Sequence, residues 1–133
     1  MFKLVFLSIV FTALALAQQP AAILTNLATA KWTHDKGDPP GSESVMLRMD
    51  EKSGGMELLV RYPAGHVFKP HFHESNERII VLEGQLTVND TPLDAGGFAM
   101  LPAKEAQRLS CTSKTRCTFY LSWDGSPKSY PAK

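Results

Sequence analysis

Three of the four histidines in this chain fall between residues 66 and 73, and two of them, His71 and His73, are separated by one residue. In an extended strand, residues two apart share a face, so both imidazoles point the same way. Glu77 lies four residues after His73, beyond a polar turn, which brings its carboxylate back beside them. Two imidazoles and one carboxylate bind non-haem iron, and also manganese, zinc, nickel or copper. We therefore predict one divalent metal ion at these residues.

The alternative is a polar surface hairpin whose histidines bind nothing, a common fate of His-x-His alone. The next strand, 77–82, argues against it, because its apolar residues fall on both faces: Ile79 and Val81 on one, Ile80 and Leu82 on the other. Such a strand is expected to be buried on both faces. Its outer face should then pack on another layer or a second subunit, which favours a homodimer.

The elements that must position this cluster are short strands separated by turn residues, and no useful helical period follows the N-terminal segment. This pattern predicts an all-β sandwich or barrel. The expected organisation is a leader and loop at 18–44, a barrel domain at 45–124 and a polar tail at 125–133. Besides 77–82, the predicted strands are 45–49, 56–62, 85–88, 98–101, 107–111 and 116–123.

The first 17 residues have the character of a secretory signal peptide. Lys3 precedes an almost wholly apolar run, and Ala15-Leu16-Ala17 fits a signal-peptidase site. The alternative is an uncleaved membrane anchor. We expect a periplasmic or secreted protein without stable membrane association after cleavage. Because Lys3 is the only charged residue removed, the mature chain is close to neutral and has no concentrated basic face, which argues against nucleic acid as a partner.

The two cysteines, Cys111 and Cys117, are separated by five polar residues that suit a turn. Strand-like sequence flanks them, so a hairpin that places them opposite each other across its ladder would allow a disulfide. The alternative is a pair of buried free thiols.

The central stretch resembles the first motif of the cupin superfamily: a glycine, five residues, His-x-His, three residues, Glu, six residues and a second glycine. Gly65, His71, His73, Glu77 and Gly84 stand at all five fixed positions. The resemblance covers roughly residues 45–123. It implies a small jelly-roll-like cupin β-barrel with a metal in its mouth.

The second cupin motif is matched only in part. Gly96 and Pro102 agree with it, but Lys104 replaces a glycine, and Gln107 stands where the fourth ligand, a histidine, is expected. Three readings stay open: Gln107 is a weak fourth ligand through its amide oxygen, it holds a water or substrate beside a three-ligand metal, or the site is degenerate. Alternation places Gln107 on the same face as Leu109 and Cys111.

The resemblance implies an exported divalent-metal-binding cupin, and among cupin activities an oxygenase acting on a small-molecule ligand suits this site. Phe68, Phe72, Met100 and Phe119 are candidates for the apolar walls of the substrate pocket. The alternative is a non-enzymatic metal- or ligand-sensing barrel, because the chain also resembles the cupin domain of zinc-binding anti-sigma factors. A third reading is a structural dimerising barrel with a vestigial site. His34 and His66 are expected to be loop histidines outside the cluster.

Overall fold

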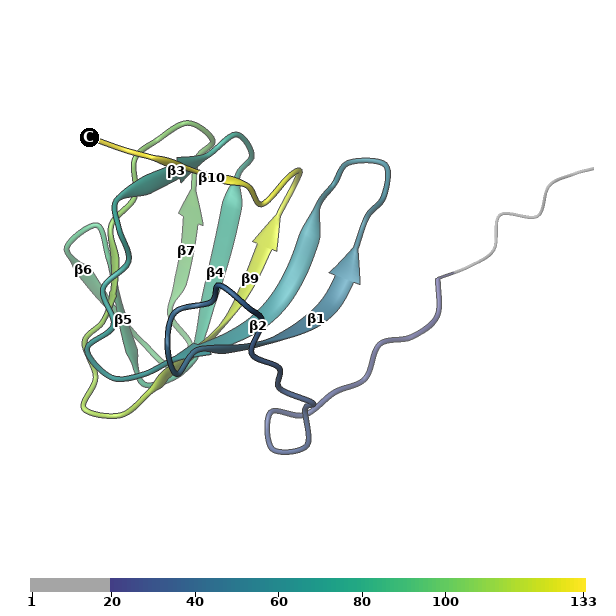
Figure 1. Ribbon diagram of the computed structural model, residues 1–133, viewed down its shortest axis with the longest axis horizontal. Coiled ribbons are helices and arrows are strands. Elements are labelled where there is room, and N and C mark those ends of the chain that lie inside the picture. The colour runs from purple at the N-terminus through teal and green to yellow at the C-terminus, as the bar shows by residue number, and fades with distance from the viewer. Residues whose placement is uncertain (1–19) are drawn as a thin grey trace, which may run out of the picture.

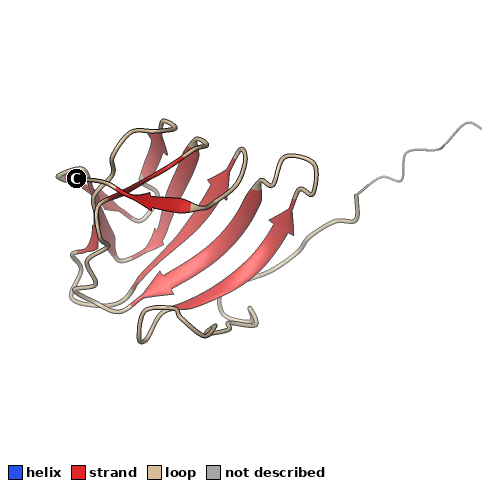
Figure 2. Ribbon diagram, turned by 45° about the horizontal axis from the view of Figure 1, so that its top comes forward, coloured by secondary structure: helices blue, strands red, loops and turns tan. Residues whose placement is uncertain are grey.

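The computed structural model describes residues 20–133, which form strands and connecting loops without a helix (Figures 1 and 2). The predicted signal peptide lies outside the described residues. Over that described range, no helix has the length and apolar character needed to cross a membrane. The strands are β1 (Glu43–Met49), β2 (Met56–Tyr62), β3 (His71–His73), β4 (Glu77–Glu83), β5 (Gln85–Val88), β6 (Thr91–Asp94), β7 (Phe98–Leu101), β8 (Leu109–Cys111), β9 (Cys117–Trp123) and β10 (Ser129–Pro131).

The strands form two main sheets and one short ribbon. The large sheet has the order β1-β2-β9-β4-β7, the small sheet has the order β6-β5-β8, and the ribbon pairs β3 with β10. All of these pairings are antiparallel. Strands distant in sequence are neighbours, as β9 is inserted between β2 and β4 (Figure 1). The predicted all-β, jelly-roll-like fold is confirmed.

The chain passes from the large sheet to the small sheet at Gly84, between β4 and β5. Gly84 has a φ of 73°, in the left-handed region that favours glycine, and an added Cβ would lie 2.6 Å from the carbonyl oxygen of Arg116. Asn89 and Asp90 then turn β5 into β6, both with positive φ, as a two-residue hairpin turn requires. Asn and Asp are residue types that tolerate such φ values.

One hydrophobic core lies between the two sheets. Along the large sheet, Ile79 and Val81 of β4 are opposite Leu121 and Phe119 of β9, and these residues are all buried. The small sheet contributes the rest of the core from Leu86, Val88, Leu109 and Cys111. Because residues opposite each other in an antiparallel pair share a face, the alternating pattern of each strand fills one interior.

Two features differ from the expectations. Residues 107–111 and 116–123 do not form a hairpin, since β8 pairs with β5 while β9 pairs with β2 and β4. The polar tail at 125–133 contains a strand, β10, that was not among those predicted. The outer face of β4 is partly open within this one chain, with Ile80 38% exposed, and its cover by a second subunit stays a prediction.

Candidate metal centre

The two imidazoles of the His-x-His pair lie on β3 with their Nε2 atoms free to bind a cation. The Nδ1 atom of His71 is 2.8 Å from the carbonyl oxygen of Lys69, and that of His73 is 3.1 Å from the carbonyl oxygen of Lys128. A carbonyl only accepts hydrogen bonds, so Nδ1 carries the proton in both rings and the lone pair is left on Nε2. Such a partner on the second nitrogen is usual for a metal-binding histidine.

Glu77 is the first residue of β4 and only 2% exposed. Its Oε2 atom lies 3.4 Å from Nε2 of His73 and accepts no hydrogen bond from the described residues. One ligand atom from each of His71, His73 and Glu77 falls within 4.8 Å of the other two. The cluster predicted from spacing is therefore assembled in the fold.

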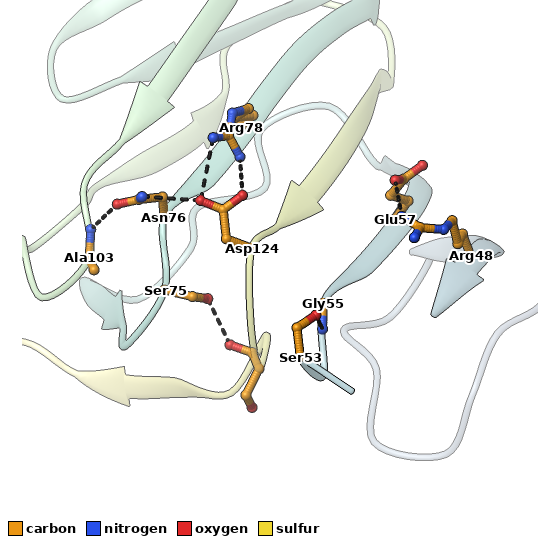
Figure 3. A network of polar contacts seen from close by, with 10 residues as sticks. Arg48, Ser53, Gly55, Glu57, Ser75, Asn76, Arg78, Ala103 and Asp124 are labelled. Atoms are coloured by element: carbon orange, nitrogen blue, oxygen red, sulfur yellow. Dashed lines mark hydrogen bonds and ion pairs between the residues drawn. The ribbon is translucent and has the colours of Figure 1, made fainter. Parts of the chain in front are cut away.

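A polar network outside the cluster holds the turn that joins β3 to β4 (Figure 3). Arg78 donates to both carboxylate oxygens of Asp124, at 2.6 and 3.3 Å, and Asn76 donates to the same carboxylate. Asn76 also accepts a hydrogen bond from the backbone N–H of Ala103, and the Ser75 hydroxyl donates to the carbonyl of Ser126. The network fixes the turn that sets Glu77 against His73.

Gln107 lies beside the cluster, although it belongs to no strand. Its backbone exchanges two hydrogen bonds with the backbone of His71, at 2.7 and 3.2 Å, so the two residues are directly opposite each other. Its side chain is 2% exposed and lies beside the carboxyl group of Glu77, whose pKa it lowers. Its Oε1 atom has no hydrogen-bond donor among the described residues. Gln107 thus supports Glu77 and offers one further oxygen.

The electrostatics of this cluster suit a cation. Burial raises the pKa of Glu77 to about 7, and its polar contact with Gln107 offsets part of that rise. Burial also lowers the pKa of His73, which favours the neutral imidazole that binds metals. Two buried oxygens, Glu77 Oε2 and Gln107 Oε1, have no donor among residues 20–133, and a cation would satisfy both. These donors fit a divalent metal ion.

A cavity of about 490 Å³ reaches the cluster and is lined by His71, His73 and Glu77. This volume falls within the range of small-molecule sites. The apolar part of its wall comes mostly from β2, β9 and the segment before β3. The lining includes Leu58, Val60, Tyr62, Phe68, Leu109, Phe119, Leu121 and Trp123.

Two of the four expected wall residues, Phe68 and Phe119, line this cavity, whereas Phe72 and Met100 do not. Phe72 alternates with the flanking histidines and instead stacks on Tyr130 at 5.5 Å. Met100 is 50% exposed on β7. Closeness to the motif in the sequence does not tell which face of a strand an apolar side chain occupies.

The remaining histidines lie outside the cluster. His66 stacks on Tyr62, with 4.8 Å between ring centres, and the Nδ1 atom of His34 lies 2.7 Å from the carbonyl oxygen of Ser42. Neither belongs to the group that could hold a metal. Both match the expectation of histidines in loops.

Cys111 and Cys117 are joined by a disulfide, with their Cα atoms 5.8 Å apart. It links β8 of the small sheet to β9 of the large sheet, and its two residues are 1% and 0% exposed. The cysteines are therefore paired between sheets and not across one hairpin.

Strand β10, which was not among the predicted strands, pairs with β3 and supplies Ser129, Tyr130 and Pro131 to the cavity wall. The preceding residue, Lys128, provides the carbonyl that orients His73. The only local signal was Tyr130, a large aromatic residue in an otherwise polar segment. Neither pairing with β3 nor a backbone carbonyl contact leaves a pattern of residue types.

A family model described as the ChrR cupin-like domain matches residues 20–124. No curated protein sequence shows significant similarity to the chain. A solved structure of Rhodobacter sphaeroides SigE in complex with the anti-sigma factor ChrR is similar with a TM-score of 0.63 at 17% identity. The match covers 74% of this chain but only 52% of that one.

Two further solved structures are similar over nearly their whole length. A putative acetylacetone dioxygenase from Methylibium petroleiphilum has a TM-score of 0.68 at 17% identity, covering 89% of this chain and 90% of that one. An acetylacetone dioxygenase from Acinetobacter johnsonii has a TM-score of 0.66 at 12% identity, covering 85% and 87%. At these identities the likeness establishes the fold and not the activity.

Proposed function

The chain belongs to the ChrR cupin-like domain family, and from that premise we propose that it is an exported protein that binds one divalent metal ion and a small organic ligand. The observation that carries the proposal is the convergence of His71, His73 and Glu77 within 4.8 Å, beside an open cavity. Iron, manganese, zinc, nickel and copper all suit these donors.

In this proposal the chain holds the metal through Nε2 of both histidines and the carboxylate of Glu77, with Gln107 Oε1 as a further donor. When bound, the metal supplies a Lewis acid or redox centre. The carbonyls of Lys69 and Lys128 hold the two imidazoles in the required tautomer. The apolar wall of the cavity excludes water from the ligand.

The activity we propose is oxygenation of the bound ligand by dioxygen. Its support is the cavity of about 490 Å³ that reaches the cluster, together with a fold shared with the structures of one acetylacetone dioxygenase and one protein described as a putative acetylacetone dioxygenase. A protein that only stored or sensed a metal would need no such ligand space.

The second candidate is a metal- or ligand-sensing domain without turnover. The observation that favours it is the family match itself, since ChrR is named as an anti-sigma factor in its complex with SigE. In this reading, occupation of the cavity or metal site would alter contacts with a protein partner.

Export to the periplasm or exterior is part of the proposal. It is supported by the apolar segment after Lys3 and by the disulfide between Cys111 and Cys117, because disulfides persist mainly in oxidising compartments.

We also propose a homodimer formed through the edge of the large sheet. Ile80 on β4 pairs with Phe98 on the edge strand β7, and both are exposed, as is Met100. An exposed apolar edge favours pairing with another chain. Sedimentation equilibrium should give a dimer for the native protein and a monomer for Phe98→Ser/Met100→Ser. A native monomer would rule this arrangement out.

Metal analysis of the purified mature chain tests the proposal. After loading and dialysis, we expect about one metal equivalent in the native protein and in His34→Ala, and almost none in His71→Ala/His73→Ala. His34 is a matched control because it is an exposed histidine outside the cluster. Equal metal content in the native protein and the double variant would refute the proposed site.

The two functional candidates separate in an oxygen-electrode assay with the metal-loaded protein. Oxygen uptake with enolisable diketones or phenols, lost in His71→Ala/His73→Ala, would support the oxygenase. Full metal occupancy with no uptake from any compound would favour the sensing domain.

A further inference from the structure

The inward face of the large sheet changes from polar to apolar along its length. Glu77 of β4 is opposite Trp123 of β9 at one end. The next rows on the same face are wholly apolar, with Ile79, Leu121 and Leu58 in one and Val81, Phe119 and Val60 in the other. Because Leu58, Val60, Phe119 and Leu121 line the cavity, its occupant meets the metal cluster at one end and hydrocarbon beyond it.

An aromatic cluster forms part of the apolar wall. The ring of Tyr62 is 4.6 Å from that of Phe68 and 5.8 Å from that of Phe119, and Phe68 meets both of these rings edge-on. Aromatic rings prefer edge-to-face and offset contacts with other rings. A flat aryl group in the cavity would extend this arrangement, whereas a polyhydroxylated sugar would leave its hydroxyls without partners there.

The charges around the cavity favour an anionic head group. Among the residues that line the cavity, the one lysine is Lys69 and the one acidic residue is Glu77, which belongs to the cluster. Lys69 is exposed and takes part in none of the ion pairs of the described residues. Lys128 lies close by, with Nζ 5.0 Å from the ring centre of Tyr130, another lining residue.

The charge count at the cluster points in the same direction. Two neutral imidazoles and one carboxylate leave a divalent cation with one unbalanced positive charge, which a monoanion neutralises. A second carboxylate on the ligand would have to enter the apolar part of the cavity, where an unpaired charge is costly.

We propose that the ligand is an aromatic monocarboxylate, with its carboxylate at the metal cluster near Lys69 and its ring between the apolar walls formed by Phe68, Phe119 and Leu121. The inference rests on the proposed function, because the head group is assigned to a loaded metal site.

Calorimetric titration of the zinc-loaded chain tests the proposal with three probes. Benzoate carries both recognised features, acetate carries only the head group, and benzyl alcohol carries only the ring. We expect benzoate to bind at least about tenfold more tightly than either, because burial of the ring and charge pairing both contribute. Equal affinity for acetate and benzoate would overturn the assignment of the ring, and equal affinity for benzyl alcohol would overturn that of the charge.

Lys69→Met removes the rim charge while keeping a long side chain, and Lys52→Met, in the exposed turn between β1 and β2, is its matched control. Benzoate affinity should fall about three- to tenfold in Lys69→Met at low ionic strength and less at high salt, because the charge is exposed. Benzyl alcohol affinity should stay unchanged. Equal benzoate affinities in the two variants would overturn the role of Lys69.

Zinc is measured in the same samples by elemental analysis. A chain that holds zinc but does not prefer benzoate overturns this inference alone. A chain that holds no zinc overturns the proposed metal site, and with it the head-group assignment.

Discussion

The buried carboxylate of Glu77 suits metal binding but is unfavourable for folding without a metal. It occupies an inward position on β4, where the other inward residues, Ile79 and Val81, are apolar and fully buried. A carboxylate there loses hydration, and its polar contact with Gln107 offsets only part of that loss. Such a residue destabilises the metal-free fold, and that cost is recovered when a cation is bound.

Glu77 should make the metal-free protein less stable as pH rises. Burial raises the pKa of Glu77 from 4.5 to about 7 in the folded chain, so between these values its carboxyl group binds more protons in the folded state than in the unfolded state. The contribution of Glu77 to the unfolding free energy should fall through that window by up to about 3 kcal/mol, and the lowered pKa of His73 acts in the opposite direction. Urea unfolding of metal-free protein at pH 5 and pH 8 measures it.

Glu77→Gln should remove most of this pH dependence, because the amide does not titrate. Glu105→Gln, a substitution of an exposed carboxylate in the loop before Gln107, is the matched control and should behave like the native protein. If the native protein and Glu77→Gln had parallel pH profiles, Glu77 would not be the titrating group.

Gln107 differs from histidine both as a metal ligand and in its contact with the carboxyl group of Glu77. We expect Gln107→His to bind zinc about tenfold more tightly, because imidazole is the better ligand for this metal. Gln107→Leu should bind zinc more weakly than the native protein, because both the amide oxygen and the polar contact that favours the ionised Glu77 are lost. Competition titration with a chromogenic chelator measures both affinities.

The control introduces a histidine away from the cluster, at Gln85. The side chain of Gln85 donates a hydrogen bond to Asp94 on the small sheet. Gln85→His should leave zinc affinity unchanged. Zinc affinity that was the same in Gln107→His, Gln107→Leu and the native chain would mean that position 107 does not contact the metal or its ligands.

At the scale of elements, the three-residue strand β10 contributes directly to the site. It pairs with all of β3, from Ser129 opposite His73 to Pro131 opposite His71. The segment leading into it carries the carbonyl that orients His73. The last strand therefore closes one wall of the cavity and fixes a ligand at the same time.

A chain that ends at Pro127 should bind zinc about ten- to a hundredfold more weakly, because groups that orient a metal ligand typically contribute that much. A chain that ends at Pro131 keeps β10 and the Lys128 carbonyl and is the matched control. Zinc titration, with circular dichroism to verify folding, measures the difference. Identical affinities in the two truncated chains would show that β10 has no role in the site.

Local residue patterns were sufficient for some elements and not for others. The bounds of β2, β5 and β7 agree with those predicted, since each strand ends at residues that favour turns. The positions of His71, His73 and Glu77 followed from alternation and one turn. The partner of each strand could not be predicted in this way: β8 and β9 are joined by a short polar loop that suits a hairpin, yet they enter different sheets. Pairing is decided by distant strands, such as β5 for β8, and no local pattern encodes it.

For the molecule as a whole, the two sheets are held together by the apolar core and by one covalent link. Cys111 is in the small sheet opposite Leu86, and Cys117 is in the large sheet opposite Tyr62. Gln107 is four residues before Cys111, whereas Glu77 is on β4 next to β9. The disulfide therefore joins the two layers that supply the two buried oxygens of the site.

Removing this link should lower the stability of the fold more than it changes the metal site. A sequence separation of six residues between the cysteines corresponds to about 2 kcal/mol of loop-closure entropy in the unfolded chain. Cys111→Ala/Cys117→Ala should therefore lower the free energy of unfolding by about 2 kcal/mol, with a further loss from the emptied space in the core. Urea unfolding measures the total for the double variant.

Comparison with the reduced native chain separates these two contributions, because reduction opens the link and leaves both sulfur atoms in the core. Cys111 and Cys117 are at most 1% exposed, so reduction requires denaturant before refolding without oxidant. The reduced chain should lose about 2 kcal/mol and the double variant more, with zinc affinity changed less than in the chain ending at Pro127. If the reduced chain were as stable as the oxidised one, the core alone would hold the two sheets together.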